Sequence, residues 1–307
     1  MDASELRYDD LVDRIEVLYN DHRYRAATDL LNAERDGLEV WAAELAHLKA
    51  CLLGADGDAD GALRVLQDAS TAGAWWRRSI LTEDDDLAAL QDRPAFLELI
   101  ELSESRVVDD PVPPLMALPG QAVDGGLRGV VVALHGAGQT AGHARRDWGG
   151  VVELGYALVC VQSSYRMSPR YRTWPDPEQA RADIARALAE LPAAIADVAG
   201  TDAAGRLPVV AAGFSAGGRV ALDWALTGRP TAVAGVLALA PALRELPAYA
   251  GGKLSPATIW IGTDDDLLEV VDGAAEQLTG FGCSIERLPG LGHAFPAAFD
   301  ELLAGVL

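Results

Sequence analysis

The sequence predicts an α/β protein in which a mostly parallel sheet is flanked by helices, with an all-α helical domain in front of it. Three observations support this prediction. Apolar residues recur at helical spacing through the first third of the chain, where prolines are nearly absent. Short β-branched or Ala/Leu runs then alternate with amphipathic stretches, as in a parallel sheet covered by helices on both faces. A proline-rich segment separates the two regions.

The boundary falls in the segment DDPVPPLMALP. Its four prolines lack a backbone donor and bias the residues before them away from helix. We therefore expect an α-helical module over 1–108, a linker over 109–119 and an α/β domain over 120–307. Within the module, ELAHLKACLLGADGDADGALRVLQDASTAG predicts two amphipathic helices joined by a polar turn. This stretch resembles a tetratricopeptide-type helical hairpin.

The α/β domain contains a series of short runs that predict buried strands. These runs are GVVVALHG, YALVCVQ, LPVVAAGF, AVAGVLALA, ATIWIGT and CSIERL. Before them only Leu115 to Leu118 has strand character, and weakly.

Composition excludes several classes of protein. The net charge is −21 and the chain has only two lysines, Lys49 and Lys253, so nucleic acid and anionic lipid are not expected partners. The three cysteines are widely spaced, without CxxC or Cys/His ligand spacing, which predicts neither disulfides nor a zinc site. No run approaches the length of a membrane span. We expect a cytoplasmic protein.

One stretch copies the beginning of a calcium-binding loop. Asp56, Asp58 and Asp60 precede Gly61 in the order D-x-D-x-D-G, but the twelfth position is Gln67 rather than Glu. A polar turn between two helices explains the same residues, so no metal is expected here.

Ser215 is the predicted nucleophile. The run Gly213-Phe214-Ser215-Ala216-Gly217 lies between a predicted strand and a predicted helix, and G-x-S-x-G in this context is typical of a strained turn that exposes a serine over the sheet. A glycine-rich turn with an incidental serine is the alternative.

A serine nucleophile needs a histidine base that a carboxylate orients. His143 and His293 are the remaining candidates once the helical module and His135 are set aside, and we expect His293, in a Gly-rich loop after the last strand. The acid should come from the three aspartates after ATIWIGT. We expect Asp265, with Asp264 as the fallback and Asp266 as the cap of the next helix.

The order Ser215, Asp265, His293, with the His135-Gly136-Ala137-Gly138 turn after the first strong strand, resembles the α/β-hydrolase superfamily over about the last two thirds of the chain. The GFSAGG, GTDD and GHAF motifs are similar to those of its phospholipase/carboxylesterase and dienelactone-hydrolase-like branches. The resemblance implies an oxyanion hole formed by the backbone amides of Ala137 and Ala216. It gives His135 a structural role and requires no cofactor.

Two loops at the carboxyl ends of the strands carry aromatic and basic residues that we expect at the mouth of the site. The expected substrate-binding residues are Trp148, Tyr165, Arg166, Arg170 and Trp174. Such a cluster favours an anionic ester. Surface pairing of these arginines with neighbouring acids, Asp147 among them, is the alternative.

The sequence therefore predicts a serine hydrolase that cleaves small-molecule carboxylic esters or thioesters through an acyl-serine intermediate. A peptidase with the same residues is one alternative. A non-catalytic interaction protein is another, because a fold does not guarantee chemistry. The helical module could bind a protein partner or pair two chains as a homodimer.

Overall fold

A computed structural model describes residues 3–120, 126–199 and 205–307. The chain forms two compact units, of which the first contains Met1–Asp109 and Arg166–Tyr171. The second contains Asp110–Tyr165 and Arg172–Leu307. The first unit thus takes a short segment from the middle of the region that the sequence analysis assigns wholly to the α/β domain.

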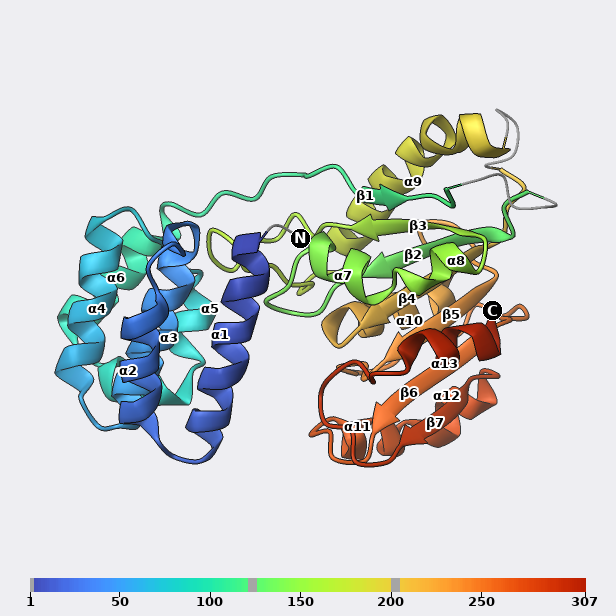
Figure 1. The fold of residues 1–307 in the computed structure, drawn as a ribbon. Helices are drawn as coiled ribbons and strands as arrows, with labels where there is room; N and C mark the ends of the chain where they lie inside the picture. The colour runs from blue at the N-terminus through green and yellow to red at the C-terminus, as the bar shows by residue number, and fades with distance from the viewer. Residues whose placement is uncertain (1–2, 121–125, 200–204) are drawn as a thin grey trace. The chain divides into compact units, whose positions relative to one another are not determined.

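The first unit is helical, with the helices coloured blue to cyan in Figure 1. They are α1 Ala3–Asn20, α2 Tyr24–Glu34, α3 Ala42–Ala55, α4 Ala59–Thr71, α5 Arg78–Thr82 and α6 Pro94–Glu104, with 3-10 turns η1 Glu39–Trp41 and η2 Asp85–Leu90. Buried residues from α1, α2 and α3 form one core cluster, and those from α3, α4, α6 and η2 form another. Burial of these apolar stripes holds the helices together.

The turn between α3 and α4 explains the calcium-like sequence. The side chain of Asp58 caps α4 by accepting a hydrogen bond from the amide of Gly61 at 2.8 Å. The carboxylate of Asp56 lies 2.9 Å from Nε of Arg25, and Asp60 pairs with Arg93. Each of the three acids therefore has a protein partner.

The second unit is built on a seven-stranded sheet in the order β1-β3-β2-β4-β5-β6-β7. The strands are β1 Leu115–Ala117, β2 Gly129–Leu134, β3 Tyr156–Val161, β4 Val209–Phe214, β5 Gly235–Leu239, β6 Ala257–Gly262 and β7 Ser284–Leu288. Strands β2 to β7 pair in parallel, and β1 pairs antiparallel with β3. The expected linker over 109–119 therefore ends in an edge strand.

Helices cover both faces of this sheet, as parallel strands require. They are α7 Ala141–Asp147, α8 Gly150–Glu153, α9 Pro177–Ala199, α10 Ala216–Thr227, α11 Leu268–Gly273, α12 Ala275–Gly280 and α13 Phe299–Val306. In Figure 1, α8 and α13 lie in front of the strands, and α10 lies behind them. Across the described ranges, no helix is both long enough and apolar enough to cross a membrane.

The strand order fixes where a site can form. From β2 the chain crosses to β3 on one side and then returns to β4 on the other, so β2 and β4 are neighbours, with Leu134 opposite Gly213. In a parallel sheet, the loops after two such strands leave in opposite directions, and functional sites commonly form at this edge. Ser215 follows β4 and His135 follows β2.

Candidate active site

Ser215 occupies a strained turn between β4 and α10. Its backbone has φ 52° and ψ −118°, which is costly for a residue with a side chain. The surrounding hydrogen bonds hold this conformation, because the Ser215 amide donates to the carbonyl of Leu239 at 3.0 Å and its carbonyl accepts from the amide of Ala242 at 3.0 Å. The strain presents the hydroxyl at the end of the strand.

Two glycines make the turn possible. A Cβ on Gly217 would overlap the carbonyl oxygens of Leu134 and His135, and a Cβ on Gly213 would overlap the backbone of Gly217. Helix α10 can therefore approach the ends of β2 and β4 only because both positions lack a side chain.

His293 and Asp265 form the hydrogen-bonded pair that the sequence predicts. Nδ1 of His293 lies 2.9 Å from Oδ2 of Asp265, whose side chain is fully buried, whereas the imidazole is 40% exposed. The other oxygen of Asp265 accepts from the amide of Leu267 at 2.8 Å. A buried carboxylate fixed in this way holds the imidazole in one orientation and favours a proton on Nδ1.

The neighbouring aspartates do not share this environment. Oδ1 of Asp264 accepts from Oγ1 of Thr263 at 3.1 Å, on the exposed side of the turn. Helix α11 begins at Leu268 without a side-chain cap, so the expected cap at Asp266 is wrong. The amide of Leu267 donates to the carboxylate of Asp265 instead.

The imidazole of His293 lies against the strand that carries the serine. The rings of Phe214 and His293 have centroids 4.8 Å apart, and Phe214 directly precedes Ser215. Within the described residues, no hydrogen bond joins the Ser215 hydroxyl to His293. Such bonds are often long in the absence of substrate and shorten in the reacting complex.

The backbone amides of Ala137 and Ala216 form no hydrogen bond to a protein acceptor in the described parts of the chain. Ala216 is the first residue of α10, where amides have no partner within the helix. Around Ala137 the loop is fixed, since the Gly136 amide donates to Oε1 of Gln139 at 2.9 Å and the Gly138 amide donates to the Arg172 carbonyl at 2.9 Å. Amides without a protein acceptor near a nucleophile can stabilise an oxyanion.

His135 has a different environment from His293. It is buried, its Nδ1 lies 2.7 Å from the carbonyl of Gly136, and its Nε2 accepts from the amide of Ser163 at 3.2 Å. Burial lowers its pKa to about 3. A neutral histidine with both nitrogens engaged supports the loop rather than transferring protons.

His143, the other candidate base, is also buried and caps a helix. It forms a capping box with Thr140 at the start of α7, in which the Thr140 amide donates to Nδ1 of His143 at 3.2 Å. Its role in the structure is to begin this helix.

The expected substrate-binding cluster requires correction at both tryptophans. Trp148 is fully buried and packs edge-to-face on Phe295 and Phe299, so it is a core residue. Trp174 is 1% exposed, and its indole N–H donates to the carbonyl of His135 at 2.8 Å. Neither side chain can contact substrate without moving out of the core.

The arginines of this cluster are also placed differently from the expectation. Arg166 and Arg170 belong to the helical unit, where the Arg170 guanidinium lies 5.6 Å from the ring centroid of Trp41. Tyr165 is half-buried at the end of the preceding loop. Arg146, another basic residue that follows β2 along the chain, pairs with Asp147 at 2.5 Å.

A cavity beside the nucleophile turn escaped the sequence analysis. It has a volume of about 150 Å³, and two basic residues, Arg219 and Arg244, and two acidic residues, Asp223 and Glu245, are among those that line it. The amide of Arg219 donates to the carbonyl of Ser215, which places the start of this cavity one helical turn from the nucleophile. The sequence contained one sign of this cavity, because Arg219 lies in the first turn of the helix after G-x-S-x-G.

Residues 7–110 match the family model described as "A/B hydrolase-like, N-terminal domain". No curated protein matches the chain. Among solved structures, an uncharacterized protein from Bacillus cereus ATCC 10987 is 21% identical, with 97% of this chain and 96% of that chain covered and a TM-score of 0.46.

Two esterases are similar to somewhat less than two thirds of the chain. Est2 from Thermogutta terrifontis, bound to propionate, is 17% identical, with 62% of this chain and 87% of that chain covered and a TM-score of 0.47. Esterase PE8 is 19% identical, with 64% and 99% covered and a TM-score of 0.44. Residues 7–110 are therefore similar to an A/B hydrolase-like N-terminal domain. The sheet order and the serine turn give the second unit an α/β-hydrolase fold.

Proposed function

We propose that this protein is a serine hydrolase that cleaves carboxylic esters or thioesters, with Ser215 as nucleophile, His293 as base and Asp265 as the orienting acid. The observation that carries the proposal is the 2.9 Å bond between His293 and the fully buried carboxylate of Asp265. It occurs where the ring of His293 packs on Phe214, the residue before the strained serine. The strain and the available amides of Ala137 and Ala216 support the same reaction.

In this mechanism, Oγ of Ser215 attacks the ester carbonyl carbon and transfers its proton to Nε2 of His293. The carbonyl oxygen becomes an oxyanion and accepts hydrogen bonds from the amides of Ala137 and Ala216, each of which contributes about 3 kcal/mol. His293 then protonates the leaving alcohol or thiol as the acyl-serine forms. Water, deprotonated by the same imidazole, releases the acid and restores the serine.

Arg219 and Arg244, rather than Arg166 and Arg170, are the arginines that could recognise an anionic substrate. Arg219 and Arg244 line the cavity that begins one turn from Ser215, and Arg244 is exposed. Asp223 and Glu245 line it too, but Asp223 already pairs with Arg181 at 3.0 Å. A carboxylate on the acyl or alcohol group would pair with them there. We expect Arg244→Gln to lower kcat/KM for a carboxylate-bearing ester about tenfold relative to a neutral ester of the same length. An unchanged ratio would remove this cavity from substrate recognition.

Labelling with a fluorophosphonate, followed by a series of p-nitrophenyl esters, tests the proposed activity. Wild type and the control Ser284→Ala, which changes an exposed serine in β7, should be labelled and should turn over at least one ester. Ser215→Ala should lose both properties while keeping its circular dichroism spectrum. Folded wild type that resists labelling would favour the interaction-protein alternative, and cleavage of aminoacyl amides without esters would favour a peptidase.

A further inference from the structure

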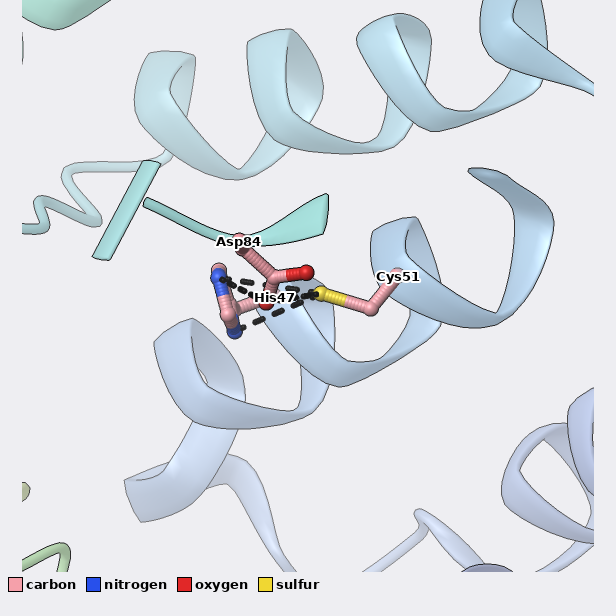
Figure 2. Close-up of side chains that lie close together, drawn as sticks. All are labelled: His47, Cys51 and Asp84. Atoms are coloured by element: carbon pink, nitrogen blue, oxygen red, sulfur yellow. Dashed lines mark hydrogen bonds and ion pairs between the residues drawn. The ribbon is translucent and has the colours of Figure 1, made fainter. Parts of the chain in front are cut away.

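The helical unit contains a compact group of metal-binding side chains that takes no part in the proposed hydrolysis. His47 and Cys51 lie one turn apart on α3, and Asp84 lies just before η2 (Figure 2). Their ligand atoms all lie within 4.8 Å of one another. We propose that His47, Cys51 and Asp84 form a zinc site in the helical unit.

The separations among these atoms match those around a tetrahedral ion. Sγ of Cys51 lies 3.7 Å from Nε2 of His47 and 3.2 Å from Oδ2 of Asp84, and Nε2 lies 3.8 Å from Oδ2. Zinc bonds of about 2.3 Å to sulfur and 2.0–2.1 Å to nitrogen and oxygen would separate these ligand atoms by about 3.3–3.6 Å in a tetrahedron. Shifts of a few tenths of an ångström would therefore bring all three into coordination.

The chemistry of the three ligands selects zinc among common divalent ions. Imidazole and thiolate are poor ligands for magnesium and calcium, which prefer oxygen. Binding breaks the S–H bond of Cys51, forms an S–Zn bond and releases the proton to solvent. One thiolate and one carboxylate then balance the charge of the ion. Water or the carbonyl of Ile80, which lies 3.3 Å from Nε2 of His47, takes the fourth position.

An ion can reach these atoms through a cavity of about 330 Å³ that all three residues line. The carboxyl groups of Glu44 and Asp86 line it as well. Glu44 is 2% exposed, and its Oε2 has no hydrogen-bond partner among the residues that the structure describes. A buried carboxyl oxygen without a donor adds to the attraction of this cavity for a cation.

Sequence spacing could not show this site. Asp84 lies 33 residues after Cys51, and only the packing of η2 against α3 brings it close. The expectation that the chain has no zinc ligands rested on the absence of short-range Cys/His motifs. The two α3 residues alone, at i and i+4, share a helix face but are too few for a site.

Zinc uptake by the full-length protein tests this proposal independently of hydrolysis. Wild type should bind one equivalent in competition with a chromophoric chelator. Cobalt in its place should give a near-ultraviolet thiolate-to-metal band. Cys51→Ser and His47→Gln should weaken binding by more than about 100-fold. Asp84→Asn, which keeps an oxygen for the turn at η2, should weaken it as well.

Cys283→Ser and His22→Gln are matched controls, because they remove a cysteine and a histidine elsewhere in the chain. Both should bind zinc like wild type, and zinc should raise the Tm of these proteins but not of Cys51→Ser. The proposal is overturned if folded wild type takes up no zinc, or if uptake persists in Cys51→Ser and His47→Gln.

Discussion

At the scale of single residues, the proposed chemistry depends on how Asp265 uses its two oxygens. One accepts from the Leu267 amide and the other faces Nδ1 of His293. The first bond fixes the carboxylate, so the second can fix the tautomer of the imidazole. Asp264, one residue earlier, has neither contact.

This difference predicts opposite results for two matched variants. Asp265→Asn should lower kcat on an activated ester about 10³–10⁴-fold, because an amide no longer favours the proton on Nδ1 of His293. Asp264→Asn should remain within about threefold of wild type. Steady-state kinetics of both proteins distinguish them, and a larger loss in the Asp264 variant would reassign the acid.

His135 predicts a dependence of stability on pH. Its pKa is about 3 in the folded chain because of burial, against about 6.5 when unfolded, so the unfolded state takes up a proton first as pH falls. Stability is therefore lost between about pH 6.5 and pH 3. By pH 5, His135 alone lowers the free energy of unfolding by about 2 kcal/mol.

Hydrogen exchange of the β2 amides, corrected for intrinsic rates, measures this loss within the second unit. Between pH 8 and pH 5, the free energy of opening should fall by about 2 kcal/mol more in wild type than in His135→Gln. The exposed His22→Gln variant should behave like wild type. Equal pH slopes for wild type and His135→Gln would show that His135 is not buried in its neutral form.

At the scale of elements, the sequence predicts what local patterns determine. The strands, the α3–α4 hairpin and the serine turn follow from periodicity and from glycines at fixed positions, and the structure has them where they are expected. Side-chain environments depend on distant parts of the chain. Trp148 is buried by Phe295 and Phe299, about 150 residues later, and nothing in its own loop indicates this.

The junction of β4 with α10 predicts a sharp difference between adjacent glycines. A methyl group on Gly217 would overlap two carbonyl oxygens at the end of β2. One on Gly218 would lie 3.1–3.3 Å from backbone atoms of Gly213, Pro241 and Leu239, which small shifts could relieve. We expect Gly217→Ala to lower kcat/KM by more than about 100-fold or to prevent folding, and Gly218→Ala to fold and to lose less activity than Gly217→Ala. Activity assays with circular dichroism compare them, and a fully active Gly217→Ala would contradict the close approach.

At the scale of the whole molecule, the chain passes between its two units more often than a single linker implies. Residues 166–171 belong to the helical unit, where Ser168 and the amide of Arg170 donate to Oε1 of Glu44 at 2.6 and 2.7 Å. Tyr171 also shares a hydrogen bond with Tyr8. The proline-rich segment marks only one of the connections, and sequence patterns could not indicate the others because they depend on contacts with distant helices.

Glu44 is therefore expected to hold this segment in place. Glu44→Ala should expose the bonds after Arg166 and Arg170, because both donors to its carboxylate lose their acceptor. Limited trypsin digestion should cut the variant there at least about tenfold faster than wild type. Glu39→Ala, a change in the same unit outside this contact, is the control, and equal cutting of the two variants would contradict the role of Glu44.

The segment 166–171 also limits how the helical unit could be transferred to another protein. A gene fusion cut at the proline-rich segment would carry the helices without the six residues that complete them, and would leave those residues in a foreign setting. Recombination between relatives would succeed only where both pieces travel together. We therefore expect a transplanted helical unit to be complete only when residues 166–171 are transferred with it.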